Sequence, residues 1–266
     1  MPQITERSRS SPRSSTPSQK RALGDTHTSH DAVSVHRLST PFDPADWYCY
    51  ARHKPTYRGA IHEFMFFTSP VWSLAMCHRC RTREELAAAV LSCFAAAFLF
   101  LASSRYHRGK WTLQQESLAA QVDFIAISGM ITYSLSPIYA LRLGNGWLLL
   151  GGLTALGLLG AGLTIAGASR SLRTVVCLTQ GIFSSIPIAQ VDLTHFELAC
   201  LAVAGFCYVA GSAVYALKTP TLFHNHFGFH ELWHLMIVIA AAGTYTANLS
   251  VLSRTQIASE GAWAPR

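Results

Sequence analysis

Residues 235–253 of this chain read LMIVIAAAGTYTANLSVLS, and these nineteen residues include no charged side chain. A bilayer core is crossed by an α-helix of about 20 apolar residues, so the stretch predicts a transmembrane helix. Immediately before it, residues 230–234 read HELWH. Because an α-helix has about 3.6 residues per turn, His230 and His234 would lie on one face at the mouth of this helix. Ionisable groups at membrane depth are costly and are usually functional.

Six further stretches without charge precede this one, at residues 64–78, 86–104, 124–141, 143–169, 174–191 and 198–217. Only 13% of the residues are charged, whereas a soluble domain carries about 25%. We therefore predict an all-α fold, a polytopic membrane bundle of seven transmembrane helices. The first window is short, and Ile61, His62 and Glu63 would extend it at the membrane interface. A soluble protein with long buried helices is disfavoured, because too little polar sequence remains to cover such a core.

Composition divides the chain into three parts. Residues 1–53 form a basic segment rich in Ser and Thr, which predicts a disordered N-terminal arm. Residues 54–254 would form the transmembrane domain, and residues 255–266 would form a short C-terminal tail. Within the domain, Pro137 and Pro187 are expected to kink or end their helices. Cys77 and Cys80 have CxxC spacing, which alone is weak support for metal or redox chemistry, and we interpret them as structural.

The formal charge of +7 is interpreted as a signal of membrane orientation. Lys and Arg near the helix ends number nine on the side of the N-terminus and six on the other side, which predicts a cytosolic N-terminus. Membrane lipid is the expected partner, and no basic groove with interleaved aromatic residues suggests nucleic acid. The N-terminal arm is a candidate for recruiting a cytosolic partner. The sequence leaves the membrane compartment open.

Three histidines and one aspartate are predicted to share one side of the bilayer. With seven alternating spans, the second helix ends near His107, the third begins near Asp123 and the seventh begins near His230. A catalytic zinc keeps three protein ligands and one open position, and imidazole is a preferred ligand. We predict that His107, His230 and His234 bind Zn²⁺ and that Asp123 holds a water or acts as its base. Ser103, one turn before His107, can orient that water or a substrate carbonyl.

The string HELWH also matches the zincin pattern HExxH, in which Glu231 would be the general base of a metalloprotease. An intramembrane protease of that class usually has a second motif with an aspartate near an Asp-Gly pair. No such motif occurs in the predicted helices. His224 and His226 precede the last helix in a loop, and we interpret them as solvated.

At these residues the sequence resembles the hemolysin III family, within the wider progestin and adipoQ receptor superfamily of seven-helix membrane proteins. The resemblance covers residues 54–253. Residues 54–62 (KPTYRGAIH) are similar to the family's opening KPxxRGxxH, residues 103–107 (SSRYH) to its SxxxH element, and residues 230–234 to its closing HxxxH. The resemblance implies zinc bound by three histidines, an acidic residue that contacts the metal through water, and a serine beside it. These residues would be His107, His230, His234, Asp123 and Ser103.

Three functions remain open from this resemblance. Adiponectin-receptor relatives are linked to ceramidase-type hydrolysis of lipid amides, which favours a zinc-dependent hydrolase with a lipid-like substrate. The first alternative is a membrane receptor or sensor in which zinc is structural and a lipid-like ligand is bound. The second is a pore former, because founding bacterial members were described as hemolysins. No predicted helix has a polar stripe long enough to line a pore.

Overall fold

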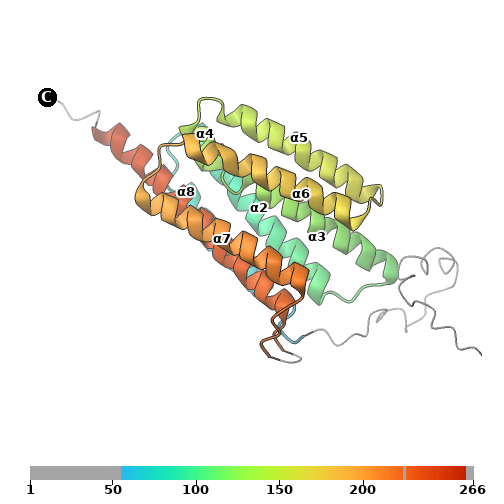
Figure 1. Ribbon diagram of the computed structural model, residues 1–266. Helices are drawn as coiled ribbons and strands as arrows, with labels where there is room; N and C mark the ends of the chain where they lie inside the picture. Colours follow the sequence, from blue (N-terminus) through green and yellow to red (C-terminus); the bar gives the residue numbers. More distant parts are fainter. Residues whose placement is uncertain (1–54, 224–225, 262–266) are drawn as a thin grey trace, which may run out of the picture. The chain divides into compact units, whose positions relative to one another are not determined.

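The computed structural model describes residues 55–223 and 226–261, and the predicted arm 1–53 and His224 lie outside them. The described chain is helical and has no named strand. Figure 1 shows the helices running alternately up and down beside one another. In chain order they are α1 (Ala60–Cys77), α2 (Arg83–Arg108), α3 (Leu113–Tyr133), α4 (Ser136–Arg142), α5 (Gly146–Ile165), α6 (Arg170–Ser185), the 3₁₀-helix η2 (Ile186–Gln190), α7 (His195–Leu217) and α8 (Phe229–Gly261).

Six helical stretches of the described chain are long and apolar enough to cross a membrane. They are Arg83–Arg108, Gln114–Arg142, Gly146–Ile165, Leu172–Gln190, His195–Leu217 and Phe229–Arg254. The predicted all-α, multi-pass membrane bundle is thereby confirmed. The first predicted helix also forms, as α1, but it includes His62 and Glu63 and is not among the six. That α1 crosses the bilayer stays a prediction.

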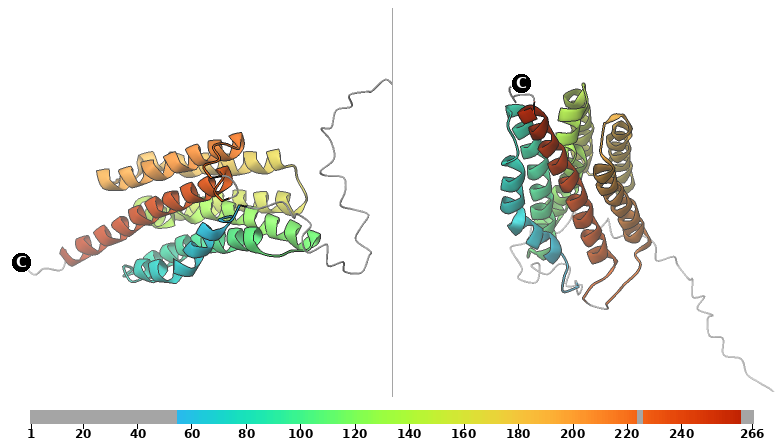
Figure 2. Two further views of the ribbon diagram at one scale, coloured as in Figure 1. Left: turned by 90° about the horizontal axis from the view of Figure 1, so that it is seen from below. Right: turned by 90° about the vertical axis from the view of Figure 1, so that its left-hand side faces the viewer.

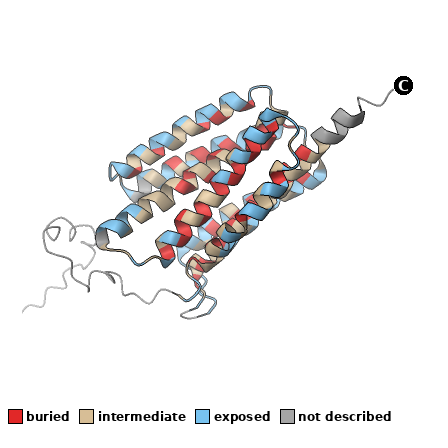
Figure 3. Ribbon diagram, turned by 180° about the vertical axis from the view of Figure 1, so that it is seen from behind, coloured by how far each residue is buried: buried red, intermediate tan, exposed pale blue. Residues whose placement is uncertain are grey.

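The outward faces of the helices are apolar, as a lipid-facing surface requires. Phe67, Leu148 and Val209 are 72%, 77% and 74% exposed. Figure 3 shows exposed residues along the outer faces of the helices and buried residues where helices face one another. In water such a surface would drive aggregation, whereas lipid tails are as apolar as these side chains. The bundle is therefore built for a bilayer.

Both helix-breaking prolines act as predicted, and Pro187 lies in the first turn of η2, directly after α6 ends at Ser185. α3 ends at Tyr133, and Pro137 lies in the first turn of α4. The carbonyl of Ser134 accepts hydrogen bonds from Ser92 Oγ at 3.1 Å and from Asn248 Nδ2 at 2.7 Å. No water is present in a bilayer core to replace such partners, so these side chains make the break tolerable.

A buried polar group joins three helices near α5. Gln180 on α6 is fully buried, and its Nε2 donates to Ser128 O at 3.1 Å and to Thr132 Oγ1 at 2.5 Å. Gly157 on α5 lies against this group, because a Cβ there would be 3.1 Å from Ser128 Oγ. Interhelical hydrogen bonds and small residues are the usual means of packing helices in membranes.

The last two helices, α7 and α8, pack along much of their length. Gly211 on α7 lies against Trp233 on α8, where a Cβ would be 2.5 Å from the indole ring. Gly243 on α8 similarly approaches the backbone of Cys200, with 2.7 Å between a would-be Cβ and the carbonyl oxygen. Figure 2 shows the two helices side by side in both views. This packing fixes the start of α8, which carries two of the predicted zinc ligands.

The prediction that the third helix begins near Asp123 was wrong, because α3 begins ten residues earlier, at Leu113. Thr112 starts the helix with a capping box, in which its Oγ1 accepts the Gln115 N–H and the Gln115 side chain accepts the Thr112 N–H. A capped helix continues through polar residues, so the absence of charge does not mark its start. Asp123 consequently lies about 15 Å along α3 from its first residue.

Candidate metal centre

Two helix ends on one side of the bundle bring three histidines together. His107 is the last residue but one of α2, and His230 and His234 occupy the first two turns of α8. α2 stops at Gly109, where the backbone becomes extended and Trp111 folds back over the chain. The predicted positions of both helix ends are thereby confirmed.

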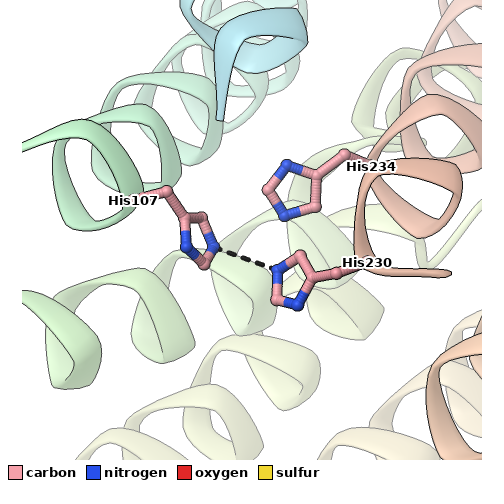
Figure 4. A group of neighbouring side chains, drawn as sticks. All are labelled: His107, His230 and His234. Atoms are coloured by element: carbon pink, nitrogen blue, oxygen red, sulfur yellow. Dashed lines mark hydrogen bonds between the residues drawn. The ribbon is translucent and has the colours of Figure 1, made fainter. Parts of the chain in front are cut away.

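The three imidazoles face one another. Their potential ligand atoms all lie within 4.8 Å of one another. The Nε2 atoms of His107 and His230 are 3.2 Å apart, as the dashed line in Figure 4 marks. The ring centroid of His234 lies 4.9 Å from that of His107 and 4.7 Å from that of His230. His107 and His234 are buried, and His230 is half-buried.

The donor set and its spacing fit a metal ion such as zinc. Two imidazole nitrogens that share a tetrahedral zinc at 2.0–2.1 Å lie about 3.4 Å apart, close to the 3.2 Å between His107 and His230. Figure 4 shows one ring nitrogen of His234 turned toward the rings of His107 and His230. The group could therefore hold a metal ion.

The structure places the other two predicted site residues beside these histidines. Asp123 Oδ2 lies 4.0 Å from His107 Nε2, and the Asp123 side chain is 17% exposed. Ser103, buried one turn before His107 on α2, lies near the Asp123 carboxyl group. All five predicted residues thus meet at one end of the bundle, although their chemical roles remain predictions.

Comparison with known protein families assigns the chain to one of them. The profile of the family described as Haemolysin-III related matches residues 50–245. The chain belongs to this family. Comparison with curated proteins gives no match. The match confirms the resemblance found in the sequence, and together with the apolar helices it identifies an integral, multi-pass membrane protein.

In this haemolysin-III related protein, an ion pair that the sequence did not predict braces the histidine group. Arg58, just before α1, donates through Nε to Glu231 Oε1. Glu231 is 1% exposed, and its other oxygen accepts the Gly228 N–H at 2.8 Å. Both carboxylate oxygens of Glu231, which lies between the two histidines in the sequence, therefore have hydrogen-bond partners. These two contacts favour a structural role for Glu231 over that of the general base in the zincin alternative.

His62 is a second residue whose place the sequence did not predict. It was expected at the membrane interface, but it is 3% exposed and packs against the histidine group. Its ring stacks on that of His234 at a centroid distance of 4.1 Å and an interplanar angle of 9°. Arg58 and His62 both occur in the family-like segment 54–62, which was the one available signal for them. His226, predicted to be solvated, is exposed and contacts Thr56.

Proposed function

We propose that this protein is a zinc-dependent hydrolase that cleaves the amide bond of a ceramide-like lipid. The observation that carries the proposal is the convergence of three imidazoles with Asp123 and Ser103 at one end of a membrane bundle. His107, His230 and His234 would hold the ion. When bound, zinc supplies Lewis-acid chemistry, since it polarises a carbonyl oxygen and makes water more acidic.

Asp123 is suited to move the proton in this reaction. Hydrolysis adds water to the amide, so one proton must leave the attacking water and one must reach the departing amine nitrogen. A carboxylate next to the reacting atoms can accept the first proton on an oxygen and deliver it to the nitrogen. Ser103, near the Asp123 carboxyl group, would orient that group. The products are a fatty acid and an amine.

An apolar cavity deeper in the bundle supports a substrate with an alkyl chain. The cavity has a volume of about 170 Å³ and lies between α1, α2, α3 and α8, where Met65, Trp72, Phe100, Met130 and Tyr245 help to line it. Phe100 comes seven residues before His107, so about 10 Å of helix separates their levels. A lipid with its chain in this cavity can place its head group near the histidines.

The test is release of fatty acid from labelled ceramide by purified protein in lipid vesicles, with and without a zinc chelator. We expect release that the chelator abolishes and that zinc restores. Asp123→Asn should lower kcat by about 10²- to 10⁴-fold, the usual contribution of a general acid–base group, with zinc content unchanged. Asp192→Asn, at an exposed position beyond η2, is the matched control and should retain activity. Absence of release, or release indifferent to chelator and to Asp123→Asn, would reject the hydrolase.

A receptor or sensor with structural zinc is the second candidate, and one observation favours it. The histidine group connects the end of α2 to the start of α8, whereas α2 packs mainly on α1, α3 and α4, and α8 mainly on α7. A metal at this place would tie the bundle together. Zinc removal should then lower the melting temperature of the protein. An unchanged melting temperature after chelation would count against a structural role.

A further inference from the structure

His62 on α1 is a buried imidazole with unused hydrogen-bonding capacity. It is the third residue of α1 and is 3% exposed. Neither of its ring nitrogens has a hydrogen-bond partner. The backbone of His234 lies close to the ring but makes no hydrogen bond of good geometry with it. Because buried polar groups in native proteins are nearly always paired, a partner from outside the chain is expected at this position.

The geometry separates His62 from the metal ligands. Among the described residues, only His107, His230 and His234 form a group whose ligand atoms lie within 4.8 Å of one another. The His62 ring is parallel to that of His234 and is displaced from it by 4.1 Å. A ring nitrogen acts in the plane of its own ring. A group bound to His62 would therefore lie beside an ion held by His234, about one ring spacing away.

His62 also packs on a residue that lines the apolar cavity. Its ring lies 5.2 Å from that of Phe100, measured between centroids, and Phe100 lines the cavity. Met65, one turn further along α1, lines it as well. His62 thus contacts both a member of the histidine group, His234, and a residue that lines the space for the alkyl chain, Phe100. An amide or ester group at the end of such a chain would lie next to the His62 imidazole.

We propose that His62 is a specificity-determining residue that accepts the N–H of the scissile amide and so favours secondary lipid amides over the matching esters. The proposal rests on the hydrolase function. A neutral imidazole has one acceptor nitrogen and one donor N–H. A secondary amide offers an N–H to that acceptor, whereas an ester oxygen offers none. Sites that hydrogen-bond a substrate group discriminate strongly against analogues that lack it, because the protein group is left unpaired.

The test uses binding, so that it stays informative if hydrolysis is never detected. Zinc-loaded protein would be titrated with N-methylpalmitamide, methyl palmitate and N,N-dimethylpalmitamide. We expect the secondary amide to bind on the order of 10-fold or more tightly than the two ligands that lack an N–H. His62→Phe keeps an aromatic ring against His234 and removes both nitrogens, so it should bind all three ligands alike. His78→Phe, at an exposed position beyond the far end of α1, is the matched control.

Each outcome bears on the proposal. Equal binding of the three ligands by the wild-type protein overturns it without any variant, which keeps the test valid if His62→Phe does not fold. A preference that persists in His62→Phe also overturns it. Loss of zinc from His62→Phe assigns the residue to support of His234 and overturns the specificity role. Amide preference without turnover would support His62 and reject the hydrolase, so the two failures are distinguishable.

Discussion

The Nε2 atoms of His107 and His230 lie 3.2 Å apart, although 123 positions separate the two residues in the chain. The pair joins α2 and α8 at one end of the bundle, where each helix packs chiefly on other neighbours. Up-and-down topology places both helix ends on the same side of the bundle, and the side chains of the two histidines meet there. Three desolvated imidazoles with facing nitrogens are costly unless a cation or a hydrogen-bonding ligand occupies the space between them.

The first prediction concerns metal content. Purified protein should contain about one zinc per chain, and His230→Ala should lower zinc affinity by at least about 100-fold, because loss of a ligand exceeds the 10- to 100-fold effect of losing an outer partner. Elemental analysis and competition with a fluorescent chelator measure both quantities. His195→Ala, at an exposed position where α7 begins, is the control and should keep its metal. Protein without bound metal, or equal affinity in the two variants, would contradict a histidine metal centre.

How far the sequence predicts this centre depends on the range of each interaction. His230 and His234 are one helical turn apart, so their shared face follows from helix geometry alone. His107 joins them through alternation of the spans, which charge-free windows reveal. Both inferences use local pattern and topology, and both hold in the structure.

Pairings across the bundle were beyond sequence reasoning. The Arg58–Glu231 contact spans 173 positions, and the sequence around either residue does not predict its partner. The burial of His62 could not be predicted for the same reason, because it depends on the close approach of α1 to α2 and α8. The start of α3 was missed for another reason, namely that capping at Thr112 allows a helix to extend through polar sequence.

A second prediction tests the Arg58–Glu231 pair. Arg58→Met should reduce stability by about 3 kcal/mol, since it leaves the carboxylate of fully buried Glu231 without its counter-charge. Thermal unfolding in detergent would measure the loss. Arg108→Met is the matched control, because Arg108 pairs with Glu63 where both side chains are about 40% exposed, and it should cost less than about 1 kcal/mol.

Glu231→Gln extends that experiment to the role of the carboxylate. A general base would be essential to turnover, whereas a brace for the first turn of α8 affects mainly stability and metal affinity. We expect Glu231→Gln to have a lower melting temperature than the wild-type protein and to retain measurable hydrolysis when loaded with zinc. Complete loss of turnover in a variant with normal melting and normal zinc content would instead support the zincin reading.

A third prediction concerns Gln180. Gln180→Leu keeps the approximate volume of the side chain but deprives Ser128 and Thr132 of their hydrogen bonds between α6 and α3. The expected loss of stability is about 1–2 kcal/mol, the scale of interhelical hydrogen bonds in membranes. Gln190→Leu, on the exposed side of η2, provides the same substitution without buried partners. Equal melting temperatures for the two variants would show that the buried polar group adds no stability.

The fourth prediction links the backbone before α1 to the metal centre. Gly59 has a φ of 74°, in the left-handed region, and a Cβ there would lie 2.8 Å from His107 Cβ. Gly59→Ala must therefore strain the turn by about 1–2 kcal/mol and push α1 away from α2. Because the contact is with His107 itself, zinc affinity should fall together with stability, by about 10-fold or more. Gly144→Ala is the control, since a Cβ at Gly144 meets no atom within 4 Å. Parallel melting and zinc-competition measurements on the two variants decide the matter, and a Gly59→Ala protein with full zinc affinity would mean that α1 can shift without disturbing His107.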